Sequence, residues 1–176
     1  MLYVQQSLGP DEELVYIGKF HWMYTVQAFL SIFWGLVMGI LVIVAAVNIY
    51  RILGYSHGGT SLLHMIRELH PGIRLLAFLM FIFGLLKFAH MMVIKATTEI
   101  AITNNRLVYK RGLVARQVGE ISIDRIEGVN VLQSVLGRIF NYGRIMVRGM
   151  GVGEVLLPTI EDPVEFRRAI EKARSL

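Results

Sequence analysis

The sequence contains no cysteine and few charged residues. The absence of cysteine excludes disulfide bonds, thiolate zinc sites and cysteine nucleophiles, and it removes the redox state of a compartment as a clue to location. Charged residues make up only 18% of the 176 residues, whereas an average soluble domain has about 25%. Hydrophobic residues make up 55%, and the mean hydropathy is +0.55. This composition predicts that part of the chain lies in a membrane.

The apolar residues are unevenly distributed. Nearly all of the surplus lies in residues 22–94, whereas residues 97–176 have the charge density and turn residues of a folded water-soluble domain. The net charge of +5 and the pI near 9.7 suit an anionic partner. Membrane proteins also concentrate Lys and Arg on their cytoplasmic side, so charge alone does not identify a partner.

Residues 26–50 form the first predicted membrane span. They contain no charged residue, and they are more numerous than the roughly 20 needed to cross the hydrocarbon layer as a helix. A cleaved signal peptide is the competing interpretation. It would have a shorter apolar core behind a basic start, whereas the segment before this span is acidic at Asp11, Glu12 and Glu13.

Residues 73–94 form the second predicted span, which contains Lys87 and His90 near its end. The aliphatic stem of Lys87 can carry its ammonium group toward the headgroups. Alternatively, Lys87 and His90 lie on one helical face and meet a partner inside a bundle. We predict a helical hairpin over residues 26–95, preceded by a cytoplasmic or interfacial segment over residues 1–25.

Basic residues near the ends of the spans predict the orientation of the hairpin. The positive-inside rule favours cytoplasmic termini, because more basic residues lie on the terminal side than in the connecting loop. The terminal side has Lys19, Lys95, Arg106, Lys110 and Arg111, and the loop side has Arg51, Arg67 and Arg74.

Small residues recur at every fourth position of the first span, at Ser31, Gly35 and Gly39. Such a row lets two helix backbones approach closely. One candidate partner is the second span, near Ala77 and Gly84. Contact with another copy of the chain is the alternative, and the pattern alone does not choose between them.

A short amphipathic helix is predicted over residues 60–70, between the spans, with Thr60 or Ser61 as its cap. His57, His64 and His70 are seven and six positions apart. They share no helical face, so we predict no metal site there.

Residues 96–176 form the predicted soluble domain, in which apolar and polar residues alternate as in half-buried antiparallel strands. The expected strands are 98–103, 106–111, 116–123, 127–133, 143–149 and 154–160. Asn104-Asn105, which can adopt positive φ, and Gly151-Val152-Gly153 are predicted hairpin turns. A final helix is expected to begin with a capping box, in which Asp162 caps, Pro163 takes the first position and Glu165 the third.

Several motifs of this half resemble the bacterial pleckstrin-homology-like (PH-like) domain of small membrane proteins. They are Thr103–Leu107, Tyr109–Gly112, Ile121–Ile126, Gln133–Gly137, Tyr142-Gly143 and the segment 158–163, and upstream Gly9–Glu12 and His21-Trp22 are also similar. The resemblance implies a fold of two nearly orthogonal antiparallel sheets closed at one end by the C-terminal helix. It also implies a cytoplasmic domain tethered at the bacterial inner membrane, and no shared catalytic residues.

The sequence shows no set of catalytic residues. Glu120, Asp124 and Glu127 resemble a group of catalytic carboxylates at first sight. However, Glu120 and Asp124 occupy the polar face of an alternating strand, which is the usual place for solvated side chains. The glycine-rich run 149–153 lacks the lysine and the strand-to-helix context of a phosphate loop. We therefore predict a protein that is not an enzyme and uses no cofactor.

The most promising functional surface is basic. Lys110, Arg111 and Arg116 flank a turn, and Arg144 and Arg148 lie on one face of a strand. They could attract anionic lipid or pair with nearby acidic residues.

Three functions follow from these features. The first is a homo-oligomeric assembly module that presents its PH-like domain to other membrane proteins, because sheet edges can add strands. The second is a sensor of anionic lipid or another ligand, and the third is an oligomeric channel or transport component that uses Lys87 and His90. Nucleic-acid binding is not expected, because the basic residues do not alternate with exposed aromatic residues.

Overall fold

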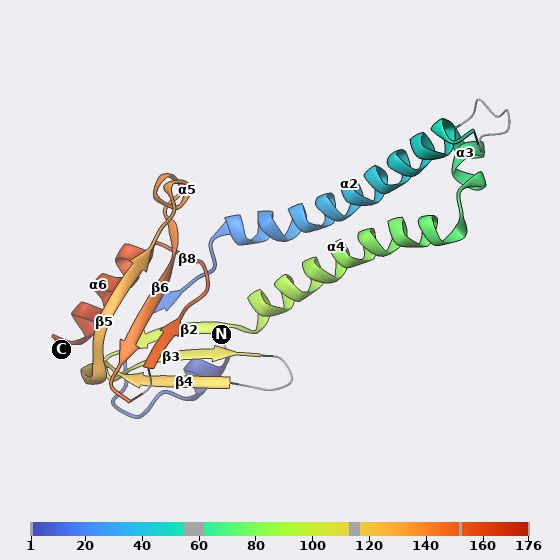
Figure 1. The fold of residues 1–176 in the computed structure, drawn as a ribbon. Helices are drawn as coiled ribbons and strands as arrows, with labels where there is room; N and C mark the ends of the chain where they lie inside the picture. Colours follow the sequence, from blue (N-terminus) through green and yellow to red (C-terminus); the bar gives the residue numbers. More distant parts are fainter. Residues whose placement is uncertain (1, 55–61, 113–116, 152, 176) are drawn as a thin grey trace. The chain divides into compact units, whose positions relative to one another are not determined.

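The computed structural model describes residues 2–54, 62–112, 117–151 and 153–175 (Figure 1). The chain divides into two compact units: residues 25–92 form one, and residues 1–24 together with 93–176 form the other. The helices are α1 (Leu2–Gln6), α2 (Trp22–Ile52), α3 (Leu62–Glu68), α4 (Pro71–Thr97), η1 (Ile123–Arg125), α5 (Val135–Ile139) and α6 (Pro163–Ala173). The strands are β1 (Leu14–Gly18), β2 (Glu99–Thr103), β3 (Arg106–Arg111), β4 (Gln117–Ser122), β5 (Ile126–Leu132), β6 (Tyr142–Gly149), β7 (Gly153–Leu156) and β8 (Ile160–Glu161).

The unit of residues 25–92 is a helical hairpin made from most of α2 and α4, with α3 between them. Both long helices are sufficiently long and apolar to cross a membrane, and they contain the predicted spans 26–50 and 73–94. α3 lies within the predicted 60–70, while its proposed caps Thr60 and Ser61 lie outside the described residues. α4 begins at Pro71, since the first turn of a helix needs no backbone N–H donor.

The first sheet of the other unit has the strand order β1-β2-β3-β4, and all of its neighbouring strands are antiparallel. Strand β1 was not among the strands expected from the sequence. Residues 1–25 were expected to form a separate segment, but Gly18 pairs with Ile100 and Leu14 with Thr103. β1 has no clear alternation, because four of its five residues are partly buried. The pattern that reveals a half-buried strand is therefore missing.

The second sheet has the order β5-β6-β7, with β8 also paired to β6. The expected strand 154–160 is divided into β7 and β8. Pro158 lies in the gap, where its lack of an N–H prevents a ladder hydrogen bond. Both sheets are antiparallel as predicted, and the two long apolar helices are consistent with the predicted hairpin.

The main hydrophobic core lies between the two sheets and includes one face of α6. Fully buried side chains from all three elements belong to this single cluster, among them Ile100, Ile102, Leu107, Ile145, Val147, Phe166 and Ile170. α6 contributes Phe166, Ala169, Ile170 and Ala173, the apolar face predicted from their helical spacing.

The predicted capping box of α6 is wrong. Asp162 precedes Pro163 as expected, but it adopts a left-handed conformation with φ 46° and makes no capping hydrogen bond. Its carboxylate instead accepts a hydrogen bond from the Asn141 amide, and Glu165 pairs with Arg168. The Asp162 carboxylate thus binds the Asn141 side-chain amide and not the backbone N–H groups of the first turn of α6.

A smaller apolar cluster lies on the outer face of the first sheet. It joins Val4 of α1 to Ala101 and Val108, with Tyr3 and Leu14 packed against it. Because side chains alternate along a strand, Ala101 and Val108 point away from the main core. α1 therefore gives this sheet a second buried face.

Candidate functional site

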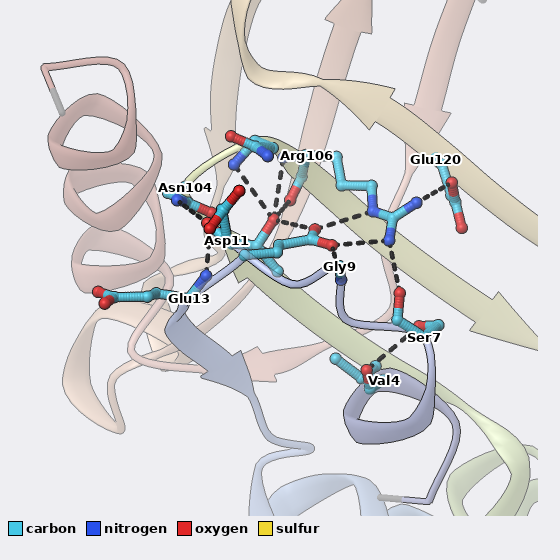
Figure 2. Close-up of polar contacts among 11 residues, drawn as sticks. Val4, Ser7, Gly9, Asp11, Glu13, Asn104, Arg106 and Glu120 are labelled. Atoms are coloured by element: carbon cyan, nitrogen blue, oxygen red, sulfur yellow. Dashed lines mark hydrogen bonds and ion pairs between the residues drawn. The ribbon is translucent and has the colours of Figure 1, made fainter.

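The most connected polar group of the described chain lies around Arg106, on the outer face of the first sheet. Arg106 donates from Nε and Nη2 to the two carboxylate oxygens of Glu12, at 2.9 and 2.8 Å. It also donates to Glu120 Oε2 at 2.8 Å and to the Ser7 carbonyl at 2.7 Å (Figure 2). This two-pronged geometry matches the planar guanidinium and is stronger than a neutral hydrogen bond.

Thr103 links the same carboxylate to the β2–β3 turn. Its hydroxyl donates to Glu12 Oε1 at 2.7 Å and accepts from the backbone N–H groups of Asn105 and Arg106. The predicted turn at Asn104-Asn105 is present between β2 and β3, and the Thr103 side chain holds it without positive φ at either asparagine. The Asn104 amide also bonds the backbone of Asp11 and Glu13 (Figure 2).

These contacts determine the charge state of the pair. Burial opposes ionisation of Glu12, but hydrogen bonds from Arg106, the Gly9 N–H and Thr103 outweigh it and lower the pKa of Glu12. The hydrogen bond to Glu12 raises the pKa of Arg106. Both groups are charged at neutral pH, and their partners hold them in place. The cluster joins the N-terminal segment to the sheet and leaves the Arg106 guanidinium engaged on all sides.

The basic residues predicted to bind anions do not form one patch. Lys110 and Arg111 are on β3 of the first sheet, whereas Arg144 and Arg148 are on β6 of the second. Arg116 lies outside the described residues. Arg144 and Arg148 do share the exposed face of β6.

Two of these residues already have acidic partners. Lys110 lies 3.4 Å from Glu99 and over the ring of Tyr3. Burial opposes ionisation of Glu99, but the Val4 N–H and Lys110 outweigh it and lower the pKa of Glu99. Arg148 pairs with Glu154. Arg111 and Arg144 are exposed and pair with no acidic residue in the part of the chain that the structure describes.

The carboxylates considered as catalytic do not converge. Glu120 is a partner of Arg106, whereas Asp124 and Glu127 are exposed. Of the three histidines considered as metal ligands, His64 pairs with Glu68, and His70 accepts a hydrogen bond from the Gly72 N–H. His57 is not among the described residues.

An exposed apolar surface surrounds α5, which lies beyond the ends of β5 and β6 (Figure 1). Val135 and Ile139 are 76% and 69% exposed, and Leu132, Leu136 and Phe140 are also exposed. We call these five residues the α5 knob. This surface was not predicted from the sequence, where residues 133–137 were noted only as a motif of the family that the chain resembles. The apolar pairs Val135-Leu136 and Ile139-Phe140 after Ser134 are nevertheless visible in the sequence.

Polar contacts beneath the knob hold it in shape. Ser134 caps α5 by accepting from the Gly137 N–H, and the Gln133 amide donates to the carbonyls of Gly137 and Tyr142. A side chain at Gly137 would lie 2.6 Å from the Tyr142 carbonyl oxygen, so only glycine fits there. The apolar side chains are consequently held outward by a fixed backbone.

The start of α2 packs against the base of the knob. The buried His21 ring lies 5.0 Å from the Tyr142 ring, and the His21 Nδ1 accepts from the Met23 N–H. Trp22, the first residue of α2, meets Phe140 edge to face at 5.9 Å. The knob therefore lies where the chain leaves the folded domain for its first long apolar helix.

Within the hairpin, the small residues lie between α2 and α4. A Cβ added to Gly84 would lie 2.6 Å from the Ser31 carbonyl oxygen and 3.0 Å from Gly35 Cα. The Ser31 hydroxyl lies within hydrogen-bond distance of the carbonyls of Ala28 and Gly84, at 2.7 and 3.2 Å, and Gly39 lies against the Ala77 carbonyl. In this unit the row is occupied by contact within the chain.

An open groove runs along one side of this contact, with a volume of about 520 Å³. It is lined by the buried residues Ser31, Gly35 and Gly84 and by the exposed side chains of Trp34 and Phe83. Gln27 and Lys87 also line it. Lys87 and His90 are exposed, and neither pairs with an acidic residue that the structure describes.

Comparison with known proteins agrees with this architecture. The model of one protein family, described as "Bacterial PH domain", matches residues 14–174, which include β1, the hairpin and both sheets. No match was found among curated proteins or among solved structures.

Proposed function

Because the chain belongs to the bacterial PH domain family, we propose that it is a non-enzymatic, membrane-anchored assembly module. In this proposal the hairpin crosses the bacterial inner membrane twice, and the PH-like unit stands at the cytoplasmic face. There it binds further copies of the chain and other membrane proteins. The observation that carries the proposal is the position of the hairpin within the first sheet.

The hairpin is inserted between two paired strands. β1 leads into α2, α4 leads into β2, and β1 and β2 are antiparallel neighbours. The two ends of the hairpin must therefore return to one sheet. A pair of membrane-crossing helices satisfies this requirement, because it begins and ends on the same side of the bilayer. The PH-like unit then has two short attachments to the membrane, one before Trp22 and one after Thr97.

The exposure of the two helices supports a lipid environment. Few residues are buried in the most apolar 18-residue stretch of each helix. The buried share of that stretch is 22% in α2 and 11% in α4. The core helix of a soluble protein would be mostly buried. The larger number of basic residues on the terminal side, including Lys19, Lys95 and Arg111, favours a cytoplasmic PH-like unit.

Two features support self-assembly. The groove beside the Gly35–Gly84 contact offers small residues and exposed Trp34 and Phe83 side chains to a helix of a second copy. Helices associate in lipid mainly through such packing. β4 and β7 are the last strands of their sheets among the described residues, and a strand edge can add a strand from a partner.

The structure gives less support to an anionic-lipid sensor built from the predicted basic residues. Lys110 and Arg148 already pair with Glu99 and Glu154, and the remaining charges lie on two sheets. We therefore place assembly ahead of lipid sensing by this set.

Sedimentation of the purified chain in detergent tests the proposal against its 20.0 kDa protomer mass. We expect a species larger than one protomer whose amount rises with protein concentration. Phe83→Ala should weaken association at least about tenfold, since large aromatic residues dominate packed interfaces. Phe78→Ala is the matched control, because Phe78 is exposed on α4 but does not line the groove. A protomer-sized species at every concentration would contradict self-assembly.

A further inference from the structure

The exposed apolar surface of the α5 knob requires an explanation that the folded unit does not supply. Val135, Leu136 and Ile139 are each more than half exposed, and the contacts of Ser134, Gln133 and Gly137 prevent the turn from folding inward. Exposed apolar clusters on a soluble surface are unfavourable and usually mark a binding site.

Trp22 indicates what covers the knob. It is the first residue of α2, and its ring contacts Phe140. The predicted hydrocarbon span starts at Val26, four residues later, which is about 6 Å along a helix at 1.5 Å per residue. The headgroup region on each side of the hydrocarbon is itself only about 5 to 8 Å thick. Trp22, and the Phe140 ring against it, must therefore lie in or next to this region.

Charge at the knob fits a phospholipid surface. Arg138 lies within α5, and Arg144 is the cross-strand neighbour of Leu132 at the same end of β6. Both are exposed, and neither forms an ion pair within the described residues. Apolar side chains surrounded by arginines are typical of segments that enter the headgroup boundary of an anionic leaflet.

We propose that the α5 knob is a third membrane contact. Together with Trp22, it inserts the side chains of Val135, Leu136 and Ile139 into the leaflet that α2 enters, while Arg138 and Arg144 meet lipid phosphates. This inference rests on the proposed membrane anchoring. It adds a contact that fixes the orientation of the PH-like unit on the bilayer, because a third point restricts rotation about the two chain attachments.

Single cysteine substitutions test the inference cleanly, because the chain has no cysteine. The full chain carrying Ile139→Cys, or Val135→Cys as a second position, is labelled with an environment-sensitive fluorophore. It is then reconstituted into phosphatidylethanolamine vesicles with or without phosphatidylglycerol. Met150→Cys is the matched control, since Met150 is an exposed apolar residue just beyond the opposite end of β6. At about 3.3 Å per residue, that end is roughly 25 Å away.

We expect nitroxide lipids labelled near the headgroup to quench the probes at positions 139 and 135 at least about threefold more than the probe at 150. Phosphatidylglycerol should increase this difference, and Arg138→Gln with Arg144→Gln should remove the increase. Equal quenching at 139 and 150 would overturn the inference. So would a probe at 139 that is shielded from water but not quenched by lipid, because that result would indicate a protein partner.

Flotation of the vesicles separates the two proposals. Chains that do not float with the lipid would contradict membrane anchoring itself. Chains that float, resist extraction at alkaline pH and still show equal quenching would contradict only the role of the knob.

Discussion

Arg106 donates two parallel hydrogen bonds to the carboxylate of Glu12, a residue 94 positions earlier in the chain. The whole hairpin lies between these two residues in the sequence. The Glu12 side chain is 5% exposed, and that of Arg106 is 27% exposed. The pair therefore joins the segment before the hairpin to the sheet after it, at the outer face where α1 also packs.

Replacing Glu12 should weaken this connection. Glu12→Gln keeps the size of the side chain but removes the charge that Arg106, Thr103 and the Gly9 N–H recognise. We expect a loss of roughly 1.5–3 kcal/mol in the free energy of unfolding, the usual value for hydrogen bonds to a charged group. Chemical unfolding of the full chain in detergent, followed by circular dichroism, measures it.

Glu13→Gln is the control for this variant. It makes the same change in charge at the next position, where the side chain is exposed. It should change the free energy of unfolding by less than about 0.5 kcal/mol. Equal losses in the two variants would show that net charge, and not the pair with Arg106, is responsible.

The stability of the PH-like unit should fall in acid through Glu12 and Glu99. Their pKa values are lower in the folded chain than an ordinary carboxyl value, so the folded state binds fewer protons than the unfolded state. The resulting stability is complete above the unfolded value of about 4.3 and is lost as the pH falls through the folded value.

This sign gives a test. The difference in melting temperature between the original chain and Glu12→Gln should be largest near neutral pH, and it should shrink as the pH is lowered from about 6 to about 3. Thermal melts across that range measure it. A difference that grows in acid would contradict the lowered pKa of Glu12.

Gly84→Leu should separate the two long helices. A side chain there meets the Ser31 carbonyl oxygen and Gly35 Cα, which are backbone atoms that cannot turn away. Overpacking of this kind costs about 1–3 kcal/mol. In a Trp22→Phe background, Trp34 is the only tryptophan and lines the groove beside the contact. The fluorescence of Trp34 followed during heating therefore monitors the unfolding of the hairpin. We expect Gly84→Leu to lower the melting temperature that it reports.

Ala89→Leu adds bulk to the same helix at an exposed position and should leave the melt unchanged. An equal effect of both variants would mean that Gly84 is not part of a tight helix contact.

The sequence predicts some parts of this fold well, because one physical rule determines each of them. Residues 26–50 contain no charged residue, and residues 73–94 contain only Arg74 and Lys87, so length and composition alone reveal the two long apolar helices. β6 alternates strictly because one face is buried by Ile145 and Val147 and the other carries Arg144 and Arg148. Its predicted range, 143–149, is accurate to one residue.

Other parts were missed because they depend on contacts that leave no local pattern. β1 is partly buried on both faces, because its Tyr16 side chain packs against the main core and its Leu14 side chain packs against the cluster that contains α1. The partners of Arg106 are supplied from positions far apart in the chain. Arg106 and Lys110 were considered only as positive charges, because their distances to Glu12 and Glu99 exist only after folding.

The missed strand leads to a prediction about which fragment folds. A fragment of residues 96–176, the predicted soluble domain, lacks β1 and α1. It would leave Ile100 and Ala101 without their partner strand and expose the edge of β2. We expect this fragment to aggregate or remain unfolded. Joining residues 1–21 to residues 98–176 through a short Gly-Ser linker restores β1 and α1. The linker is easily spanned, because Gly18 and Ile100 are paired neighbours.

The linked chain should therefore be soluble without detergent and unfold cooperatively, whereas the shorter fragment should not. Size-exclusion chromatography and a thermal melt of both compare them directly. Glu12→Gln in the linked chain should lower its stability as it does in the full chain, since all partners of Glu12 remain present. If residues 96–176 folded alone with equal stability, β1 would be dispensable. The insertion of the hairpin into the first sheet would then no longer support a fixed attachment of this unit to the membrane.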